Sequence, residues 1–366
     1  MHQPPMGPEP AAASLAGLTV PPLDDDAAEA ARQRQARLTK PAGSLGALED
    51  LGVRLAAMTG RVDPPLGRAV VFALAGDHGV AAEGVSAYPR EVTGQMVLNF
   101  LRGGAAVNVL AREVGARVVV GDLGVDADLP AAPGLRSRRV RRGTANLAHG
   151  PAMSRDEALA AIAAGRGLVE EELAGGLDVV LTGDMGIGNT TPSACLVCHF
   201  TGLDPAQVVG RGTGVDDATL ARKVAVVRAA LAANRQAATD AVGALAALGG
   251  LEIAGLTGVI LEGAARRRPV LVDGFIATAA ALVAAAVAPG CRGYLVAAHR
   301  SQELGHAAAL GALGLRPLLD LDLRLGEGTG ALLALPLLRA AVAVLNGMAT
   351  FEDAGVSDRP DRPPAG

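Results

Sequence analysis

One acidic residue lies among three glycines in residues 325–331, which read Leu-Gly-Glu-Gly-Thr-Gly-Ala and follow an apolar run. Glycine has no side chain and tolerates positive φ, so a ligand can approach this backbone closely while Glu327 projects toward it. The same pattern would suit the first turn of a helix, where the helix dipole favours an acid. These residues leave two interpretations of Glu327, a working carboxylate or a helix start.

A second glycine-rich stretch, residues 182–191, has the features of an anion-binding loop. It reads Thr-Gly-Asp-Met-Gly-Ile-Gly-Asn-Thr-Thr, and an apolar helix is predicted to begin near Thr191. Exposed backbone N–H groups and the positive end of a helix both attract phosphate. The stretch matches neither a P-loop nor a dinucleotide fingerprint.

Two more groups of residues could contact an anion. Residues 210–214 read Gly-Arg-Gly-Thr-Gly and precede a predicted helix that carries Lys223, although an isolated helical lysine is more often simply solvated. Residues 299–301, His-Arg-Ser, follow another apolar run. His299 and His306 lack a matching acid or cysteine cluster, so we expect no metal site there.

A flat, mostly apolar pocket is predicted after the first strand. Ser86 and Tyr88 lie in a loop, and Gln95 and Met96 follow on the next predicted helix. Few polar groups beside an aromatic ring are typical of a small-molecule site. Packing would explain Met96 equally well.

The sheet that must position these residues is visible as apolar runs. Runs at residues 69–75, 117–120 and 178–182 each lead into Gly-Asp-x-Gly-aliphatic, and further runs lie at residues 270–272, 294–297 and 318–321. Continuous apolar runs indicate strands buried on both faces, joined by helical crossovers. We predict an α/β fold: a Rossmann-like parallel sheet of about six strands whose carboxyl ends, and hence Glu327, share one ligand-binding edge.

The domain prediction follows from where these patterns begin and end. A parallel-sheet catalytic domain is predicted over residues 66–330, and a small helical domain over residues 26–65 and 331–355 that covers the mouth of the sheet domain. Ser44 is a candidate cap for the second helix. Residues 1–25 and 356–366 are predicted to be loose tails.

Composition excludes several classes of protein. The net charge of the 366 residues is -4, and the basic cluster at residues 136–142 has no aromatic neighbours, so we expect a solvated loop there and no nucleic-acid groove. Residues 1–10 lack a signal pattern, and the apolar stretch at residues 275–289 is too short to span a bilayer. These patterns predict a cytoplasmic protein with no membrane partner.

Two of the three cysteines form Cys195-Leu196-Val197-Cys198-His199, formally a haem-attachment pattern. Haem attachment requires export, and this stretch lies where an apolar helix is predicted. A buried cysteine behaves as a small hydrophobic residue, so we expect neither haem nor zinc.

Taken together, these stretches resemble the nicotinate-nucleotide:5,6-dimethylbenzimidazole phosphoribosyltransferase (CobT) family. The resemblance covers about residues 30–355, and its motifs occur in the family's order at residues 39–46, 76–80, 86–89, 103–108, 182–191, 210–214 and 325–331. It implies transfer of ribose 5-phosphate from nicotinate mononucleotide to a benzimidazole base, giving α-ribazole 5'-phosphate and nicotinate for the nucleotide loop of cobalamin. It also implies a homodimer whose partner helps to close the pocket, and no cofactor or metal.

The resemblance assigns roles to particular residues. Glu327 is expected to accept a proton, with Asp184 as its companion. The phosphoribosyl group is expected to contact Gly183, Met185, Gly186, Ile187, Gly188, Asn189, Thr190, Gly212, Thr213, Gly214, Lys223 and Ser301. The base is expected to contact Ser86, Tyr88, Gln95, Met96 and Leu325.

One residue departs from the family pattern, which usually has Glu where this chain has Asp184. The charge is kept, but the carboxylate is drawn back by one methylene, which bears on rate or base preference more than on reaction class. A catalytically silent nucleotide- or base-binding protein on the same scaffold is the alternative. A dehydrogenase is disfavoured because no dinucleotide fingerprint is present.

Overall fold

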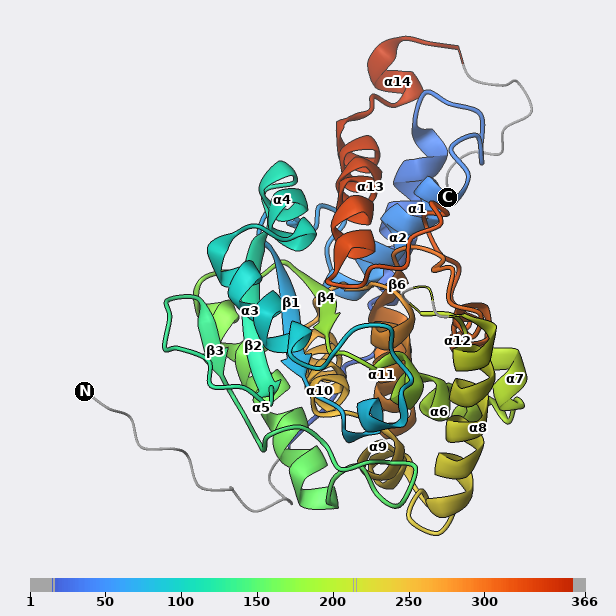
Figure 1. Ribbon diagram of the computed structural model, residues 1–366. Helices are drawn as coiled ribbons and strands as arrows, with labels where there is room; N and C mark the ends of the chain where they lie inside the picture. Colours follow the sequence, from blue (N-terminus) through green and yellow to red (C-terminus); the bar gives the residue numbers. More distant parts are fainter. Residues whose placement is uncertain (1–14, 16, 213, 215, 358–366) are drawn as a thin grey trace.

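Six parallel strands form one sheet in the spatial order β3-β2-β1-β4-β5-β6 (Figure 1). The computed structural model describes residues 15, 17–212, 214 and 216–357. The strands are β1 (Ala69–Gly76), β2 (Arg117–Gly124), β3 (Leu135–Ser137), β4 (Val179–Met185), β5 (Val270–Val272) and β6 (Leu295–Ala297). Strand order reverses between β1 and β4, and such a switch point is where parallel sheets bind ligands. The predicted Rossmann-like α/β fold is confirmed.

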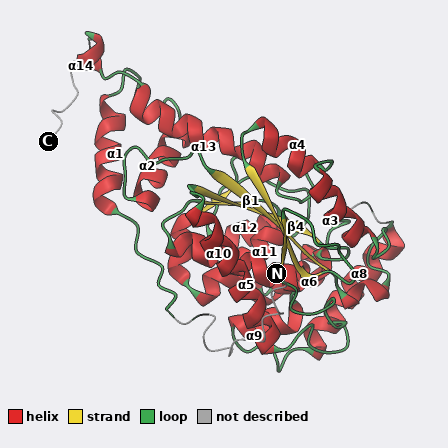
Figure 2. Cartoon of the chain, turned by 90° about the vertical axis from the view of Figure 1, so that its left-hand side faces the viewer, coloured by secondary structure: helices red, strands yellow, loops and turns green. Residues whose placement is uncertain are grey.

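Helices cover both faces of the sheet (Figure 2). On one face lie α10 (Leu251–Ala265) and α11 (Phe275–Val287), with α5 (Arg155–Ala174) packed on α10. On the other lie α3 (Val92–Arg102), α4 (Ala106–Glu113) and α13 (Thr329–Gly347). The remaining helices are α1 (Asp25–Arg37), α2 (Ala47–Thr59), η2 (Gly79–Glu83), α6 (Thr190–Thr201), α7 (Pro205–Val208), α8 (Asp217–Ala233), α9 (Ala241–Leu248), η3 (Pro289–Tyr294), α12 (His306–Leu313) and α14 (Phe351–Ala354).

The strand register places the Gly-Asp pairs at one edge. Every residue of β1 is buried, as its continuous run of Ala, Val, Phe and Leu predicts. Leu74 of β1 lies opposite Asp184 of β4, and Ala75 lies opposite Asp122 of β2. Both Gly-Asp pairs therefore belong to the last residues of their strands, where their side chains approach the carboxyl edge.

The sixth strand is not the predicted one. Residues 318–321 form only one bridge, between Leu319 and His299, and the chain then turns at Asp322 with a φ of 55°. The edge strand is instead β3, whose three residues pair with β2. Its basic neighbours are not simply solvated, because Arg139 lies 2.9 Å from the buried carboxylate of Asp122. Such a short polar strand has no apolar run by which to recognise it.

The two chain ends pack together, but not over the mouth of the sheet. Helices α1, α2 and the distal part of α13 lie side by side beyond the body of the molecule (Figure 1) and share a small core. Arg339, midway along α13, donates to the carbonyls of Leu66 and Val114, which precede β1 and β2. The group therefore extends from the amino edge, opposite Glu327. We call α1, α2 and residues 340–347 the helical extension.

Two local predictions near the amino terminus are wrong. Residues 17–24 are not a loose tail, because the Tyr294 hydroxyl donates to the Pro21 carbonyl at 3.0 Å and Leu23 packs against the core. Ser44 does not cap α2, whose N-cap is Gly46. Residues 1–14 and 16 of the predicted amino-terminal tail, and residues 358–366 of the carboxyl-terminal one, lie outside the described residues.

Helix α13 is the one described helix whose length and composition would allow it to cross a membrane. Here it packs against α2, α4 and the sheet. Its amino-terminal half lies in the core, so its apolar composition has a structural explanation within the fold.

Candidate active site

The turn that carries Glu327 adopts a left-handed backbone at three successive residues. Gly326, Glu327 and Gly328 have φ values of 80°, 63° and 90°. A left-handed conformation costs a residue with a side chain about 1–2 kcal/mol, so the surrounding structure must impose it on Glu327. Gly183 of β4 allows this turn to pack closely against the strand, because a Cβ on Gly183 would lie 2.5 Å from the Glu327 carbonyl oxygen.

Glu327 is buried and held by a single backbone donor. Its Oε2 accepts a hydrogen bond from the Val107 N–H of α4 at 3.2 Å. Burial raises the pKa of Glu327, the Val107 hydrogen bond lowers it, and the negative charge of Asp273 raises it. A carboxylate with a raised pKa is a better general base, so the first interpretation of Glu327 is favoured. The helix begins at Thr329, so Glu327 lies just before its first turn.

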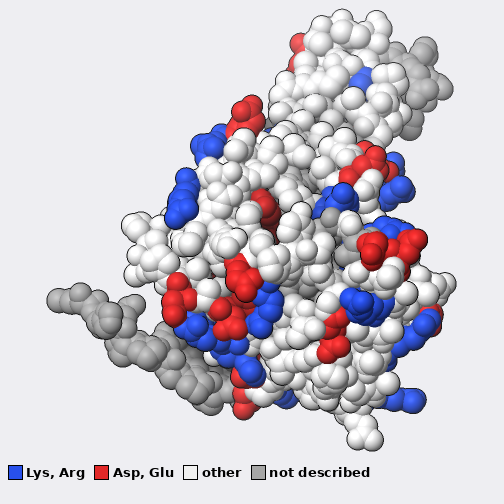
Figure 3. Space-filling view, viewed as in Figure 1, with Lys and Arg blue, Asp and Glu red and all other residues white. Residues whose placement is uncertain are grey.

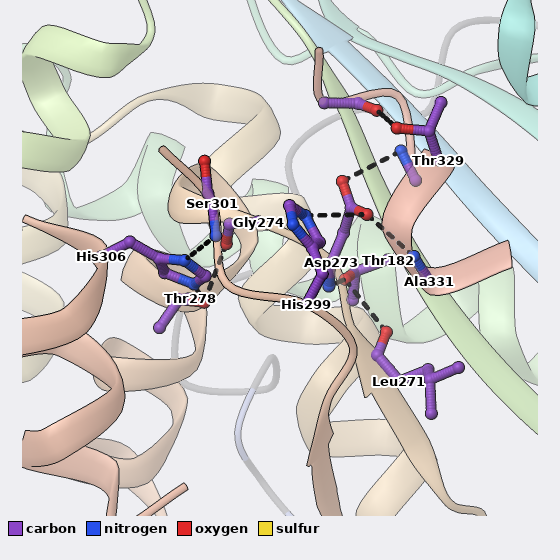
Figure 4. Close-up of polar contacts among 12 residues, drawn as sticks. Thr182, Leu271, Asp273, Gly274, Thr278, His299, Ser301, His306, Thr329 and Ala331 are labelled. Carbon is purple, nitrogen blue, oxygen red and sulfur yellow. Dashed lines mark hydrogen bonds and ion pairs between the residues drawn. The ribbon is translucent and has the colours of Figure 1, made fainter. Parts of the chain in front are cut away.

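Asp273 fastens the start of α13 to the sheet, as Figure 4 shows. It follows β5, and its two carboxylate oxygens accept hydrogen bonds from the N–H groups of Gly328 at 3.2 Å and Ala331 at 2.9 Å. Its own N–H donates to the Thr182 hydroxyl of β4. Two strand ends and the Glu327 turn are thereby joined through one buried residue, by its backbone N–H and its carboxylate.

Asp184 lies beside this turn and is mostly protonated at neutral pH. Burial raises its pKa to about 8, the charge of Asp273 adds to this, and a 2.9 Å hydrogen bond from the Asn189 amide to Oδ2 opposes it. Because Oδ2 accepts from Asn189, Oδ1 is left to carry the proton. The expectation that Asp184 keeps the charge of the family's glutamate stays a prediction, and the raised pKa of Asp184 argues against it at neutral pH.

The loop between β4 and α6 is held from two sides. Gly188 has a φ of 88°, and the Ile187 N–H donates to the Thr93 hydroxyl of α3 at 3.1 Å. A Cβ on Gly186 would lie 2.5 Å from the Gly76 carbonyl oxygen of β1. Met185, at the end of β4, is half-buried. The loop thus turns tightly across the switch point and leads into the amino terminus of α6, as predicted.

Lys223 reaches this helix start from α8. It is almost fully buried, and its Nζ donates to the Thr190 hydroxyl at 3.1 Å and the Gly210 carbonyl at 3.0 Å. Burial lowers the pKa of Lys223, and the charge of Glu303 raises it. An ammonium group has three donors, so one remains for a ligand. The solvated-lysine interpretation is wrong.

Ser301 is positioned by a neutral histidine (Figure 4). Its N–H donates to His306 Nδ1 at 2.8 Å, so the ring proton lies on Nε2 and is donated to the Thr278 hydroxyl at 2.9 Å. Thr278 in turn donates to the Gly274 carbonyl. Burial lowers the pKa of His306 to about 3, so this arrangement persists at neutral pH.

Several of these residues line one cleft with two adjoining parts, but Glu327, Asp273 and Lys223 are not among its lining residues. Its outer part has a volume of about 660 Å³, and a cavity of about 60 Å³ continues from it to Asp184. Both parts share four residues, Gly212, Ser301, Glu303 and Arg324. Among the predicted contacts, the inner part is also lined by Asn189, Thr190 and Leu325, and the outer part by Gly214. Thr213 lies outside the described residues.

The predicted base contacts are more scattered. Tyr88 is half exposed and Leu325 is 59% exposed, while Gln95 is exposed and Met96 half-buried on α3. The Tyr88 N–H donates to the Ser86 hydroxyl at 3.2 Å. Of these residues only Leu325 lines the cleft. The chain brings the phosphate-side residues together but leaves the base side open.

Several polar residues of the site were not predicted. Asp273 comes directly before Gly274 at a strand end, the same signal as Asp184, but β5 is only three residues long. Glu303 and Arg324 lie in irregular segments with no motif around them. Glu252 was not predicted either, whereas its partner His78 belongs to the motif at residues 76–80; His78 Nε2 lies 2.8 Å from Glu252 Oε1 in a buried pair beneath the ends of β1 and β4.

The cysteine pattern forms part of the core. Cys195 and Cys198 are buried in α6, and burial raises the pKa of both thiols, that of Cys198 to about 12. In the part of the chain that the structure describes, no three His, Cys, Asp or Glu side chains are grouped to hold a metal ion. The two thiols pack as small hydrophobic groups.

Fold and cleft together define the class of protein. Buried carboxyl groups at a switch point, a glycine-rich loop before a helix and a buried lysine are the features expected of a site that binds a phosphorylated sugar. A family profile described as phosphoribosyltransferase matches residues 20–356, which is most of the chain.

Individual relatives specify the family. Proteins named nicotinate-nucleotide–dimethylbenzimidazole phosphoribosyltransferase are 58% identical in Chloroflexus aggregans, over 92% of this chain and 96% of the relative, and 56% identical in Geobacter sulfurreducens, over 90% and 95%. The crystal structure of CobT from Thermus thermophilus is 53% identical, covers 91% of this chain and 100% of that one, and superimposes with a TM-score of 0.89. This chain belongs to that phosphoribosyltransferase family. The predicted resemblance is confirmed, and no relative supports the silent binding protein.

Proposed function

We propose that the protein transfers ribose 5-phosphate from nicotinate mononucleotide to 5,6-dimethylbenzimidazole or a related base, releasing nicotinate and forming α-ribazole 5'-phosphate. The observation that carries this proposal is the buried Glu327, held in a left-handed turn whose Gly326 lines the inner end of the cleft together with Asp184. Relatives with more than half of their residues identical carry names that state this reaction.

The proposed mechanism is a direct displacement at C1' of the ribose. A ring nitrogen of the base attacks the face opposite nicotinate, the C1'–N bond to nicotinate breaks, and its electron pair leaves with the neutral pyridine ring. The attacking ring gains positive charge, which acidifies its remaining N–H. Glu327 accepts that proton, and its raised pKa suits this step.

The donor site would orient the sugar for this displacement. The phosphate is placed at the start of α6, near Lys223 and Gly212, and the ribose extends toward Asp184 and Asp273. Positive charge that develops on the ribose would be stabilised by the carboxylate of Asp273, while a protonated Asp184 could donate a hydrogen bond to the sugar. The donor carries its own activated bond, so the chemistry requires no cofactor.

The test is turnover by the purified protein. Incubation with nicotinate mononucleotide and dimethylbenzimidazole is expected to release nicotinate and form a base nucleotide in equal amounts, measured by chromatography. Binding of both substrates without nicotinate release would favour the silent binding protein instead. Competition among benzimidazoles, purines and phenols would then define the preferred base.

Asp184 gives a prediction about pH and stability. The folded-state pKa of about 8 exceeds the ordinary value of 3.8, so the folded protein holds more protons than the unfolded chain between these values. Its contribution to the free energy of unfolding therefore falls as pH rises through this window. We expect Asp184→Asn, which mimics the neutral acid, to melt at a higher temperature than the parent, by a margin that grows from pH 5 to pH 9. An equal margin at every pH would contradict the raised pKa.

The open base side supports a dimer as part of the proposal. Tyr88 and Leu325 are too exposed to enclose a flat apolar base by themselves. Figure 3 shows that the upper part of the molecule, over α13 and α2, carries few charged side chains, but this part extends from the amino edge of the sheet and not from the base side. A second copy that covers the base side would exclude water from it, and sedimentation at several concentrations would detect the dimer. We place the protein in the cytoplasm, with small-molecule substrates and neither nucleic acid nor membrane as a partner.

A further inference from the structure

Three arginines line the outer part of the cleft, and they differ in what holds their side chains. Arg300 pairs with Asp320 at 3.4 Å. Arg211 pairs with Asp217. The third, Arg324, is exposed and forms no hydrogen bond or ion pair with any residue that the structure describes. A guanidinium group in a cleft with no acid of the protein to bind is available to an anionic ligand.

Arg324 also lines the inner part of the cleft, which the other two arginines do not. It shares the inner part with Thr190, Gly212 and Ser301. These three residues are among those expected to contact the phosphoribosyl group, and Thr190 lies at the start of α6, where an anion is favoured. Arg324 therefore lies at the junction of the two parts, beside the proposed phosphate subsite.

The backbone around Arg324 is fixed in this position. The chain turns at Asp322, whose φ is 55°, and the Gln302 N–H then donates a hydrogen bond to the Leu323 carbonyl at 3.1 Å. Arg324 follows directly, so its Cα is held beside the loop that carries Ser301. The side chain has no such restraint, so the guanidinium group can adjust to a ligand without movement of the backbone.

The charges around the subsite call for a second cation. Burial raises the pKa of Glu303, whereas the positive charges of Lys223 and Arg324 lower it, so the three groups lie close enough to interact. An ionised Glu303 offsets the charge of Lys223, which leaves Lys223 alone a weak attractor for a phosphate ester of nearly two negative charges. Arg324 supplies a positive charge that no acid pairs with, and its planar group can donate two parallel hydrogen bonds to phosphate oxygens.

We propose that Arg324 binds the phosphate of the donor and closes the phosphate subsite from the cleft, opposite the start of α6. The proposal rests on the proposed function for the identity of the donor. That donor carries a second anion, the carboxylate of its pyridinium ring. We assign Arg324 to the phosphate because it lines the inner part together with Thr190, Gly212 and Ser301. Arg324 is thus a specificity-determining residue that selects a phosphorylated donor.

Arg324→Gln tests the proposal at an exposed position, where the substitution leaves the fold intact. The KM for nicotinate mononucleotide is expected to rise about 10–100-fold, the usual loss for a hydrogen-bonded charge. The kcat is expected to stay within about threefold of the parent value, because the phosphate is bound equally in the ground state and the transition state. Arg324→Lys keeps the charge but not the paired donors, so its KM is expected to rise by only about three- to tenfold. A fall in kcat at unchanged KM would assign Arg324 to the neighbouring Glu327 turn and overturn the proposal.

Arg228→Gln is the matched control for the loss of one positive charge. Arg228 is exposed on α8, pairs with Asp204 at 2.7 Å and lines neither part of the cleft. Its KM for nicotinate mononucleotide is expected to change less than about twofold, because an exposed charge away from the ligand is screened. An equal rise of KM in Arg228→Gln and Arg324→Gln would mean that overall charge attracts the donor, and the proposed contact would then be wrong.

Direct binding separates the phosphate from the carboxylate and does not depend on turnover. Ribose 5-phosphate and nicotinate are titrated separately into the parent protein and into Arg324→Gln, and binding is measured by calorimetry. The affinity for ribose 5-phosphate is expected to fall about 10–100-fold in the variant, and the affinity for nicotinate is expected to stay the same. A loss confined to nicotinate would place Arg324 on the carboxylate, and no loss of either affinity would remove it from the site. Either result overturns the proposal even if the protein turns over its substrates, and the expected loss would stand even if no nicotinate were released.

Discussion

Replacement of Glu327 by Gln is expected to lower kcat by about 10²–10⁴-fold, the usual contribution of a general base. Glutamine keeps the size of the side chain and can still accept a hydrogen bond from the Val107 N–H, so the turn is retained. The amide cannot accept the proton that the attacking base loses. The KM or Kd for nicotinate mononucleotide is expected to stay within about threefold of the parent value, because the phosphate subsite is untouched.

Glu262→Gln is the control for placing an amide at a buried glutamate. Glu262 is almost fully buried and pairs with Arg166 and Arg266 at the far end of α10. It is expected to reduce stability but leave kcat unchanged where the protein is folded. Turnover of Glu327→Gln within about tenfold of the parent would remove Glu327 from the role of base.

Replacement of Asp273 by Ala is expected to impair both stability and catalysis. It leaves the N–H groups of Gly328 and Ala331 without acceptors at a buried helix start, which costs about 2 kcal/mol. The left-handed turn that carries Glu327 then loses the hydrogen bonds that hold it to the sheet. A displacement of the Glu327 carboxylate by about 1 Å is enough to lower kcat about 10²-fold. Removal of the Asp273 charge also lowers the pKa of both Asp184 and Glu327.

Asp178→Ala separates these effects. Asp178 is equally buried but lies at the amino edge of the sheet, where it accepts hydrogen bonds from the backbone and side chain of Arg68. The two variants are expected to lose similar free energy of unfolding in urea. Only Asp273→Ala should lose activity at low temperature, with an acid limb of its pH profile moved to lower pH. Equal kcat losses in both would mean that Asp273 acts only through stability.

Much of the sheet could be predicted because its central strands are continuous apolar runs. The runs that became β1, β2 and β4 end in glycine and aspartate, which indicated both their type and their shared edge. At the margins this signal fails. Residues 318–321 are apolar but turn away after one bridge, whereas β3 is a polar strand held by its pairing with β2.

Part of the candidate site could be predicted, because glycines occur where a ligand approaches the backbone closely or where the chain turns. Glu327, Asp184 and the loop to Thr190 were identified as candidates in this way. Asp273, Glu303 and Arg324 were missed because their roles depend on packing between distant segments, which a local pattern does not record. Lys223 was ambiguous for the same reason, since only the fold shows that it is buried against Thr190. The direction of the helical extension is likewise a property of tertiary packing.

Helix α13 runs from the Glu327 turn to the helical extension. Its first residue, Thr329, follows the turn that carries Glu327, and its last residues belong to the helical extension. Arg339 lies between them and donates hydrogen bonds to carbonyls at the amino edge of the sheet, which fixes the middle of the helix. At about 1.5 Å per residue the arm from Arg339 to Thr329 is about 15 Å long, so a tilt of about 5° would move the Glu327 turn by about 1.3 Å. A contact that restrains the helical extension would therefore also restrain the position of Glu327, the proposed base.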